Sequence, residues 1–148
     1  MAEIRSFEDL DAWKLGFELT IKVYKASEKF PNEERFALTN QLRRAANSIP
    51  ANIAEGFGRY TLKEYLRFLF YARGSVAETQ SHLQVATTLG YLSKSDFDDL
   101  LKLCERTRQT VQGLIRHIRL KLKDPGFETS LDYLRETEAD YPVEEPEI

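Results

Sequence analysis

The side chains that offer metal or acid–base chemistry in this chain are two histidines and many carboxylates. In a helical protein they raise the question of a di-metal site. Such a site needs a glutamate from each of two helices and a Glu-x-x-His pair from each of two others. Neither His82 nor His117 has a glutamate three residues before it, and Glu78 precedes His82 by four. We therefore expect no metal and no other cofactor, and we interpret both histidines as surface or interface residues.

Nucleophilic catalysis has no better support. Ser48 and Ser75 have no activating base nearby in the sequence, and neither lies in a strand–turn–helix setting. The run Gly-Phe-Gly at 56–58 lacks the further glycines and the lysine of a phosphate-binding loop. Cys104 is the only cysteine and lies on an apolar helical stripe, so we interpret it as a buried structural thiol. The chain is interpreted as a non-enzyme.

A proline lies inside a segment that otherwise has the pattern of a helix, residues 33–57. One face is apolar at helical spacing and comprises Leu38, Leu42, Ala45, Ile49, Ile53 and Phe57. Pro50 cannot donate a backbone hydrogen bond, so we expect it to kink the helix. The apolar face stays in phase across it, so we do not expect the helix to end there. The polar motif around the proline comprises Arg43, Arg44, Ser48, Pro50, Asn52 and Glu55.

This polar motif has two interpretations. In the structural one, Ser48 or Asn47 satisfies the carbonyls that Pro50 leaves free, while Arg44 and Glu55 form ion pairs along or between helices. In the functional one, the kink forms a pocket for a ligand or a partner. We favour the first, a structural or subunit-interface role.

Basic residues form two stripes, one early in the segment 61–90 and one late in the segment 95–123. An antiparallel bundle brings these two stretches to one end. Tyr60 and Tyr71 are interleaved there and can stack on bases. Glu55 and Glu64 dilute the positive charge, and a merely solvated basic rim is the alternative. The candidate nucleic-acid-binding residues are Arg59, Lys63, Arg67, Arg116, Arg119, Lys121 and Lys123.

Apolar periodicity predicts the helices that must position these residues, at about 6–30, 33–57, 61–90 and 95–123. Capping patterns at Ser6, Thr61 and Ser95 start three of them. The fold class is therefore all-α, an antiparallel up-down-up-down four-helix bundle. The predicted core stripe of the first helix is Leu10, Trp13, Phe17, Ile21 and Tyr24. Further apolar residues suggest self-association, namely Ala12, Leu15, Leu19, Val23, Phe68, Phe70 and Tyr71.

Charge divides the chain into two predicted parts. Residues 1–123, the bundle, hold 20 basic and 15 acidic residues, whereas residues 124–148 hold nine acids and one arginine. We expect 124–148 to be an acidic, largely flexible tail in which Phe127, Leu131 and Leu134 are spaced for a short helix. We also expect this tail to compete with phosphates for the basic end. The sequence shows no membrane-span or signal pattern, so we expect a cytoplasmic protein.

Several motifs give the chain a family resemblance; they are the stretches 7–10, 41–59, 69–78 and 89–92, together with Trp13. With them, residues 7–123 resemble the 23S rRNA-intervening-sequence protein family, small bacterial four-helix-bundle proteins. The resemblance implies a homopentamer without established catalysis. It also implies distant structural similarity to the accessory variability protein of diversity-generating retroelements, which binds nucleic acid and a reverse transcriptase.

We therefore expect a non-catalytic homo-oligomer, by resemblance a pentamer, that binds nucleic acid through its basic end. RNA is favoured over DNA. The alternative is a protein–protein adaptor or scaffold for a polymerase- or ribosome-associated partner. No membrane partner is expected.

Overall fold

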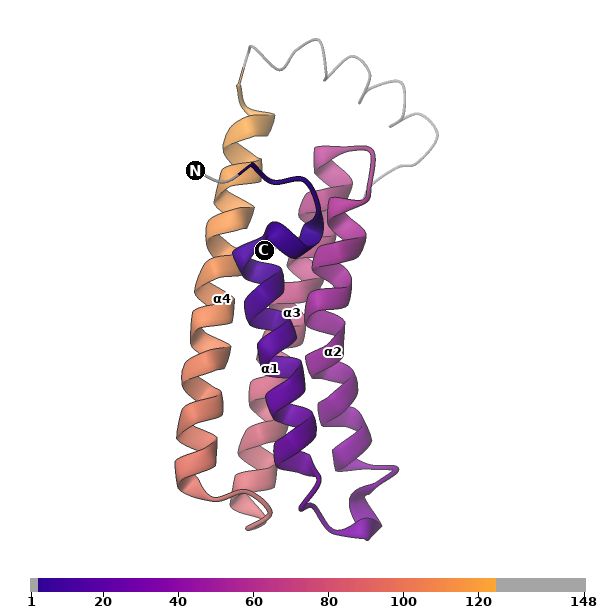
Figure 1. Ribbon diagram of the computed structural model, residues 1–148, viewed down its shortest axis with the longest axis vertical. Helices are drawn as coiled ribbons and strands as arrows, with labels where there is room; N and C mark the ends of the chain where they lie inside the picture. The colour runs from indigo at the N-terminus through magenta and orange to yellow at the C-terminus, as the bar shows by residue number, and fades with distance from the viewer. Residues whose placement is uncertain (1–2, 125–148) are drawn as a thin grey trace.

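The computed structural model describes residues 3–124 of the 148-residue chain. Within that range it has no strand, and its α-helices are α1 (Asp11–Ser27), α2 (Leu38–Phe57), α3 (Leu62–Thr88) and α4 (Lys94–Leu122). Two short 3₁₀ turns, η1 (Phe7–Asp9) and η2 (Asn32–Glu34), precede α1 and α2. This is the all-α bundle that the sequence predicted (Figure 1). The predicted tail lies outside the described residues from position 125 onward.

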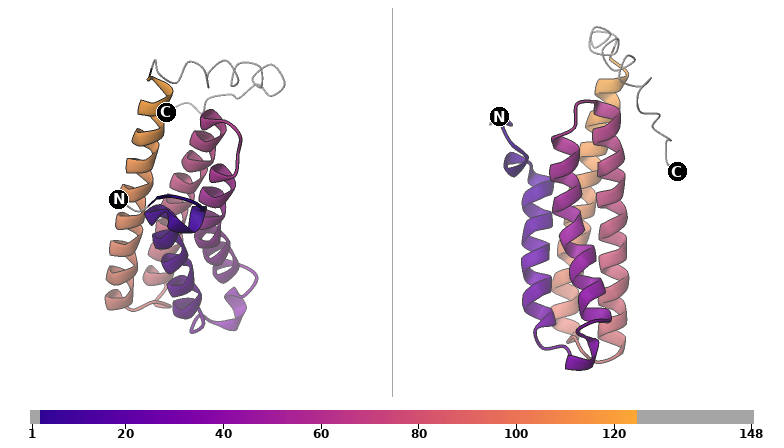
Figure 2. Two further views of the ribbon diagram at one scale, coloured as in Figure 1. Left: turned by 45° about the horizontal axis from the view of Figure 1, so that its top comes forward. Right: turned by 90° about the vertical axis from the view of Figure 1, so that its right-hand side faces the viewer.

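The helices pack as a ring in which α1 contacts α2 and α4, and α3 contacts the same two helices (Figure 2). In Figure 1, α1 and α3 run from the top of the bundle to the bottom, and α2 and α4 run from bottom to top. The α2–α3 turn, the start of α3 and the end of α4 therefore lie at one end, which we call the upper end. No helix among the described residues is long and apolar enough to cross a membrane.

Side-chain caps explain where α3 and α4 begin. The hydroxyl of Thr61 accepts a hydrogen bond from the backbone N–H of Glu64 at 3.1 Å, as predicted. For α4 the cap is Ser93, whose hydroxyl accepts from the N–H of Asp96 at 3.1 Å. The predicted start at Ser95 was therefore wrong. The Ser-x-x-Asp pattern occurs twice in this stretch, and the earlier copy forms the cap.

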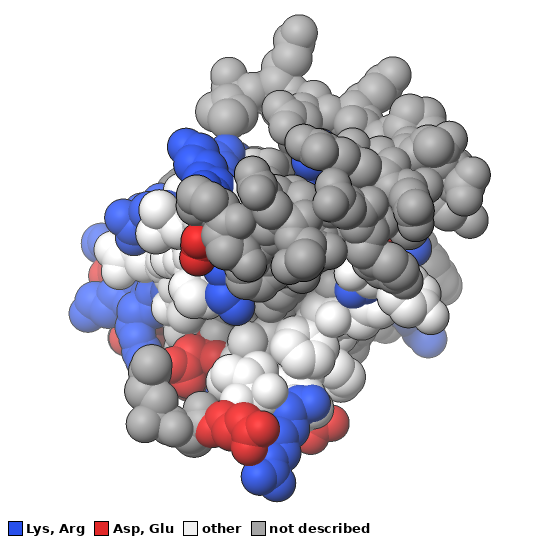
Figure 3. Space-filling view, turned by 90° about the horizontal axis from the view of Figure 1, so that it is seen from above, with Lys and Arg blue, Asp and Glu red and all other residues white. Residues whose placement is uncertain are grey.

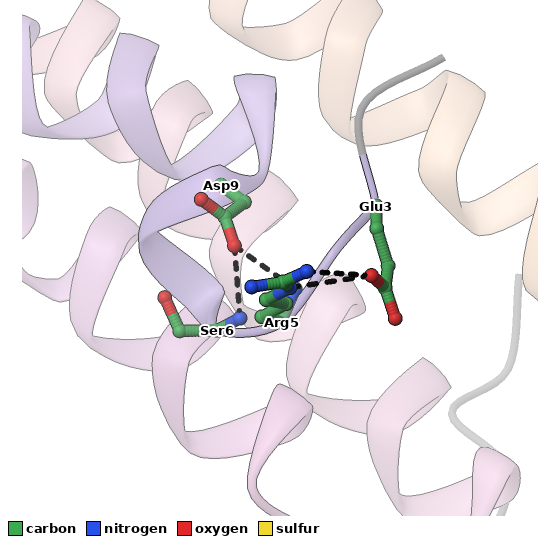
Figure 4. A network of polar contacts seen from close by, with 4 residues as sticks. All are labelled: Glu3, Arg5, Ser6 and Asp9. Atoms are coloured by element: carbon green, nitrogen blue, oxygen red, sulfur yellow. Dashed lines mark hydrogen bonds and ion pairs between the residues drawn. The ribbon is translucent and has the colours of Figure 1, made fainter.

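The capping pattern at Ser6 closes the turn η1 and does not open α1 directly. The Asp9 carboxylate accepts hydrogen bonds from the backbone N–H groups of Arg5 at 2.9 Å and Ser6 at 3.0 Å (Figure 4). These two N–H groups lower the pKa of the Asp9 carboxyl. The guanidinium of Arg5 pairs with Glu3 at 3.0 Å, and α1 itself begins at Asp11.

The predicted start of α2 at residue 33 was also wrong, because α2 begins at Leu38. The carboxylate of Glu34 accepts the backbone N–H of Leu38 at 3.1 Å and so caps the helix from the preceding turn. It also accepts the hydroxyl of Tyr91 at 3.2 Å, which ties the α1–α2 and α3–α4 connections together at the lower end.

The core face of α1 is not the one predicted. Phe17, Ile21 and Tyr24 from the predicted stripe are each at least 40% exposed. The buried residues of α1 are Ala12, Gly16, Leu19, Thr20, Val23 and Ser27. Ala12, Leu19 and Val23, which the sequence analysis assigned to self-association, belong to this buried face, so that prediction was wrong for these three residues. Phe17, Ile21 and Tyr24 lie on the outer face instead, because the buried face also contains the small residues Gly16 and Thr20.

Gly16 and Pro50 mark a close contact between α1 and α2. A Cβ added to Gly16 would lie 3.0 Å from Cγ2 of Ile49 and 3.4 Å from Cδ of Pro50. Glycine therefore allows α1 to approach the proline directly. The helix α2 continues through Pro50 without a break, whereas the kink that we expected there stays a prediction.

Candidate nucleic-acid interface

The basic residues singled out in the sequence belong to the elements that meet at the upper end. Arg59 lies in the α2–α3 turn, Lys63 and Arg67 lie on α3, and Arg116, Arg119, Lys121 and Lys123 lie on α4 or directly after it. Residues 59–73 and residues 109–124 each contain four basic residues and one acidic residue. Viewed from this end, Lys and Arg side chains are seen on the side of α4 (Figure 3).

One aromatic ring joins α3 to α4 at this end. The guanidinium carbon of Arg119, from α4, lies 5.2 Å from the centroid of the Phe70 ring on α3. Arg73, from α3 itself, lies over the same ring at 4.9 Å and donates a hydrogen bond to Oε1 of Gln112 at 2.9 Å. We call Phe70, Arg73, Gln112 and Arg119 the α3–α4 seam. Cation–π contact and the hydrogen bond thus hold guanidinium groups from two helices against one ring.

A second arginine–aromatic cluster lies beside the seam, formed by Arg59, Arg67, Phe68 and Tyr71. The guanidinium of Arg59 lies 4.7 Å from the Phe68 centroid, and that of Arg67 lies 5.7 Å from Phe68 and 5.6 Å from Tyr71. The two rings contact each other edge to face at 5.6 Å. Planar cations are therefore interleaved with aromatic rings over the first turns of α3.

The predicted basic residues differ in how much of their charge is available. Arg59 forms ion pairs with Glu55 at 2.7 Å and with Glu64 at 3.7 Å, so part of its charge is neutralised locally. Arg116 and Lys123 are exposed and have no ion pair with any described residue. They are the strongest candidates to contact a ligand outside the protein.

The structure brings most, but not all, of the predicted residues to one surface. Lys63 and Arg67 are one turn apart on α3, and Arg119 reaches α3 from α4. Lys121 follows Arg119 by two residues, which is about 200° round the helix axis. Lys121 therefore points away from the seam. It is close to the other basic residues of α4 in the sequence, but it lies on a different face of the helix.

Sequence reasoning missed Arg73 and Phe70 as members of this surface. Their spacing of three residues, which places neighbours on a helix, was the available signal within α3. The contact of Phe70 with Arg119 joins two helices, so it cannot be predicted from a local sequence pattern.

Thr20 satisfies the carbonyl that Pro50 leaves free. Without an N–H at position 50, the Ala46 carbonyl has no partner inside α2. The hydroxyl of Thr20, from α1, donates to this carbonyl at 3.0 Å. The expectation that Ser48 or Asn47 would supply this hydrogen bond was therefore wrong.

The remaining polar residues of the motif make structural contacts. Ser48 donates to the carbonyl of Ala45 at 2.9 Å and its hydroxyl bonds that of Ser75 on α3. The amide of Asn52 donates to the carbonyl of Ser48 at 2.7 Å. The hydrogen bond between Ser48 and Ser75 joins α2 to α3, and the other two lie within α2.

Arg43 and Arg44 point to different surroundings. Arg43 donates to the Ser27 hydroxyl at 2.8 Å and lies over the Tyr24 ring at 4.7 Å, so it fastens α2 to α1. The Arg44 side chain is exposed and makes no hydrogen bond or ion pair among the described residues, and Glu55 pairs with Arg59 at the basic end instead.

The other reactive groups are placed as structural residues. Cys104 is fully buried, and burial raises the pKa of its thiol to about 12, which keeps it protonated and unreactive. His82 lies 3.4 Å from Glu78, one turn away on α3. Among residues 3–124, no group of three or more His, Cys, Asp or Glu side chains is arranged to hold a metal.

Comparison with known proteins agrees with this architecture. Among solved structures, the chain is similar to a protein of unknown function from the S23 ribosomal protein family of Bacteroides thetaiotaomicron, with a TM-score of 0.64 and 18% sequence identity. The match covers 70% of this chain and 97% of the other, and at this identity it shows the fold alone. A comparison with curated proteins gave no match. The family model of the 23S rRNA-intervening sequence protein matches residues 8–113. The chain therefore belongs to the 23S rRNA-intervening sequence protein family.

Proposed function

We propose that this protein is a non-catalytic, homo-oligomeric helical bundle that binds nucleic acid, with RNA favoured, through its upper end. The observation that carries the proposal is the α3–α4 seam, where arginines from two helices meet beside exposed basic residues. A concentrated positive surface attracts the phosphate backbone through counterion release, whatever the base sequence.

The two kinds of basic residue have different proposed roles. Lys63, Arg116 and Lys123 would contact phosphates and so position the ligand without reading its bases. Arg67 and Arg119 are held on aromatic rings, so their guanidinium planes are already oriented before a ligand arrives. In a homo-oligomer the same surface repeats, which multiplies weak phosphate contacts into useful affinity.

The names of the related proteins support RNA as the ligand. The family is named for intervening sequences of 23S rRNA, and the structural neighbour is assigned to a ribosomal protein family. Both names associate such bundles with ribosomal RNA or ribosomal proteins.

A second candidate function is a protein–protein adaptor or scaffold for a polymerase- or ribosome-associated partner. The exposed stripe of Phe17, Ile21 and Tyr24 on α1 favours it, since each of these side chains is at least 40% exposed within residues 3–124. In this account the basic end is an incidental solvated rim.

Purification of the full chain from a native lysate separates the two functions. Nucleic-acid binding predicts a high ratio of absorbance at 260 to 280 nm, which falls after ribonuclease treatment. Nucleic-acid-free protein that retains a specific protein partner would instead support the adaptor.

A further inference from the structure

We propose that the ligand of the upper end is single-stranded nucleic acid, whose unpaired bases stack on Tyr60 and Tyr71. This inference rests on the proposed function and names its substrate class. It follows from how the aromatic rings are exposed among the basic residues.

Two tyrosines at the basic end are open to solvent. Tyr60, in the α2–α3 turn, is 86% exposed, and Tyr71, on α3, is 45% exposed. Neither hydroxyl has a hydrogen-bond partner among the described residues. Exposed aromatic surface is unfavourable in water, so covering these rings with a ligand would lower the free energy.

The surroundings of Tyr71 leave room for a flat ligand group. Phe68 contacts the Tyr71 ring edge to face, and Arg67 lies 5.6 Å from its centroid. Three residues further along α3 is Gly74, and a Cβ added there would meet nothing within 4 Å. The surface of α3 next to the Tyr71 ring therefore has no side chain at position 74 that would block a ligand.

This arrangement suits unpaired bases and does not suit a duplex. In a duplex the base faces are covered by their neighbours, and a protein meets mainly phosphates and hydroxyls. The rings of Tyr60 and Tyr71 would then have no base face to stack on and would add nothing to the affinity. In a single strand each base has a free face that can stack on an aromatic ring or on an arginine plane. The basic residues beside the rings would hold the phosphates of the same strand.

The test compares an unstructured uridine RNA with an RNA duplex of equal length, by fluorescence anisotropy at one low salt concentration. The variants of the full chain are Tyr60→Leu with Tyr71→Leu, which removes both rings, and Tyr60→Phe with Tyr71→Phe, which keeps them. Phe36→Leu is the matched control, because Phe36 is also 86% exposed but lies between η2 and α2, in the connection at the lower end.

We expect the natural protein to bind the single strand more tightly than the duplex. The double Leu variant should lose roughly twentyfold or more in affinity for the single strand, from about fivefold per ring. The affinity of the double Leu variant for the duplex should stay within about twofold of that of the natural protein. The double Phe variant and the Phe36→Leu control should likewise keep their affinity for the single strand within about twofold. Thermal unfolding by circular dichroism checks that the exposed substitutions leave the fold intact.

The outcomes distinguish this inference from the proposed function. If both ligands bind equally, or the duplex binds more tightly, and loss of the rings changes nothing, the single-strand inference is wrong while nucleic-acid binding stands. If neither ligand binds, both are wrong.

Discussion

The hydroxyl of Thr20 in α1 donates a hydrogen bond of 3.0 Å to the backbone carbonyl of Ala46 in α2. The partner this carbonyl would have in an uninterrupted helix is the N–H at position 50, which proline lacks. The same hydroxyl lies 2.8 Å from the carbonyl of Gly16 in its own helix. A buried acceptor created by a proline in one helix is thus satisfied by its neighbour, and α2 continues through Pro50 without a break.

Removing this hydroxyl should destabilise the fold. Thr20→Val keeps the shape and leaves the buried Ala46 carbonyl without a partner, so the free energy of unfolding should fall by about 1–3 kcal/mol. Pro50→Ala restores the N–H, so in that background the same substitution should cost under about 1 kcal/mol. Urea denaturation of the four proteins measures the coupling, and strictly additive effects would contradict this role of Thr20.

The same glycine-to-alanine change should have opposite effects at two positions. A Cβ at Gly56 would lie 2.8 Å from Cβ of Phe68 and 3.0 Å from Cδ2 of Tyr65, so Gly56→Ala should destabilise by about 1–3 kcal/mol. At Gly74 the space is open, so Gly74→Ala should stabilise α3 by up to about 1 kcal/mol. Melting temperatures that move in the same direction for both variants would rule out this account of the α2–α3 packing.

Tyr65 carries a buried hydroxyl that has no hydrogen-bond partner among residues 3–124, and burial raises its pKa from 10.0 to about 12. The folded state holds this proton more tightly than the unfolded state, so its titration leaves the free energy of unfolding unchanged below about pH 10 and lowers it as the pH rises through 12. Tyr65→Phe should raise stability near neutral pH by up to about 1 kcal/mol, since no hydrogen bond is lost.

The same variant should also show a smaller loss of stability in alkaline solution. Cys104, whose pKa is likewise raised to about 12 by burial, accounts for part of the decline that remains. Urea denaturation at about pH 8 and about pH 11 tests this, and an unchanged alkaline loss in Tyr65→Phe would contradict it.

The exposed stripe on α1 should mediate self-association. We expect the protein to scatter light as an oligomer, by family resemblance a pentamer of the 17.2 kDa chain. Phe17→Glu with Ile21→Glu places charge on this stripe and should shift the protein toward the monomer. Val85→Glu is the control, because Val85 is 43% exposed but lies on α3. A monomeric natural protein at tens of micromolar would contradict this prediction.

The helices were predictable because their periodicity is local, and so was the core face of α2. Leu42, Ile49 and Ile53 are fully buried, as their spacing indicated. The core face of α1 was not predictable in this way. Its buried face combines the small residues Gly16 and Thr20 with Leu19 and Val23, whereas Phe17, Ile21 and Tyr24 face outward.

The candidate site shows the same division between local and tertiary information. The pairs Arg67 with Tyr71 and Glu55 with Arg59 are four residues apart, so helical spacing alone places them together. The contact of Arg119 with Phe70 depends on the register of α3 against α4. The sequence could therefore predict which end is basic but not which arginines meet there.

Charge removal at the upper end tests the central claim most directly. The test variant changes Lys63, Arg116 and Lys123 to Gln. The control variant makes the same change in net charge nearer the lower end, at three exposed residues at or just after the end of α1 and in the first turns of α4, namely Lys25, Lys29 and Lys102.

The measurement is the affinity for single-stranded RNA as a function of salt concentration. If the three upper residues contact phosphates, the test variant should bind about tenfold or more weakly at low salt, and the slope of log affinity against log salt should decrease in magnitude by about 2. The control should keep the affinity and the slope of the natural protein. Equal losses in the two variants would show that only net charge matters and would contradict a nucleic-acid interface at the upper end.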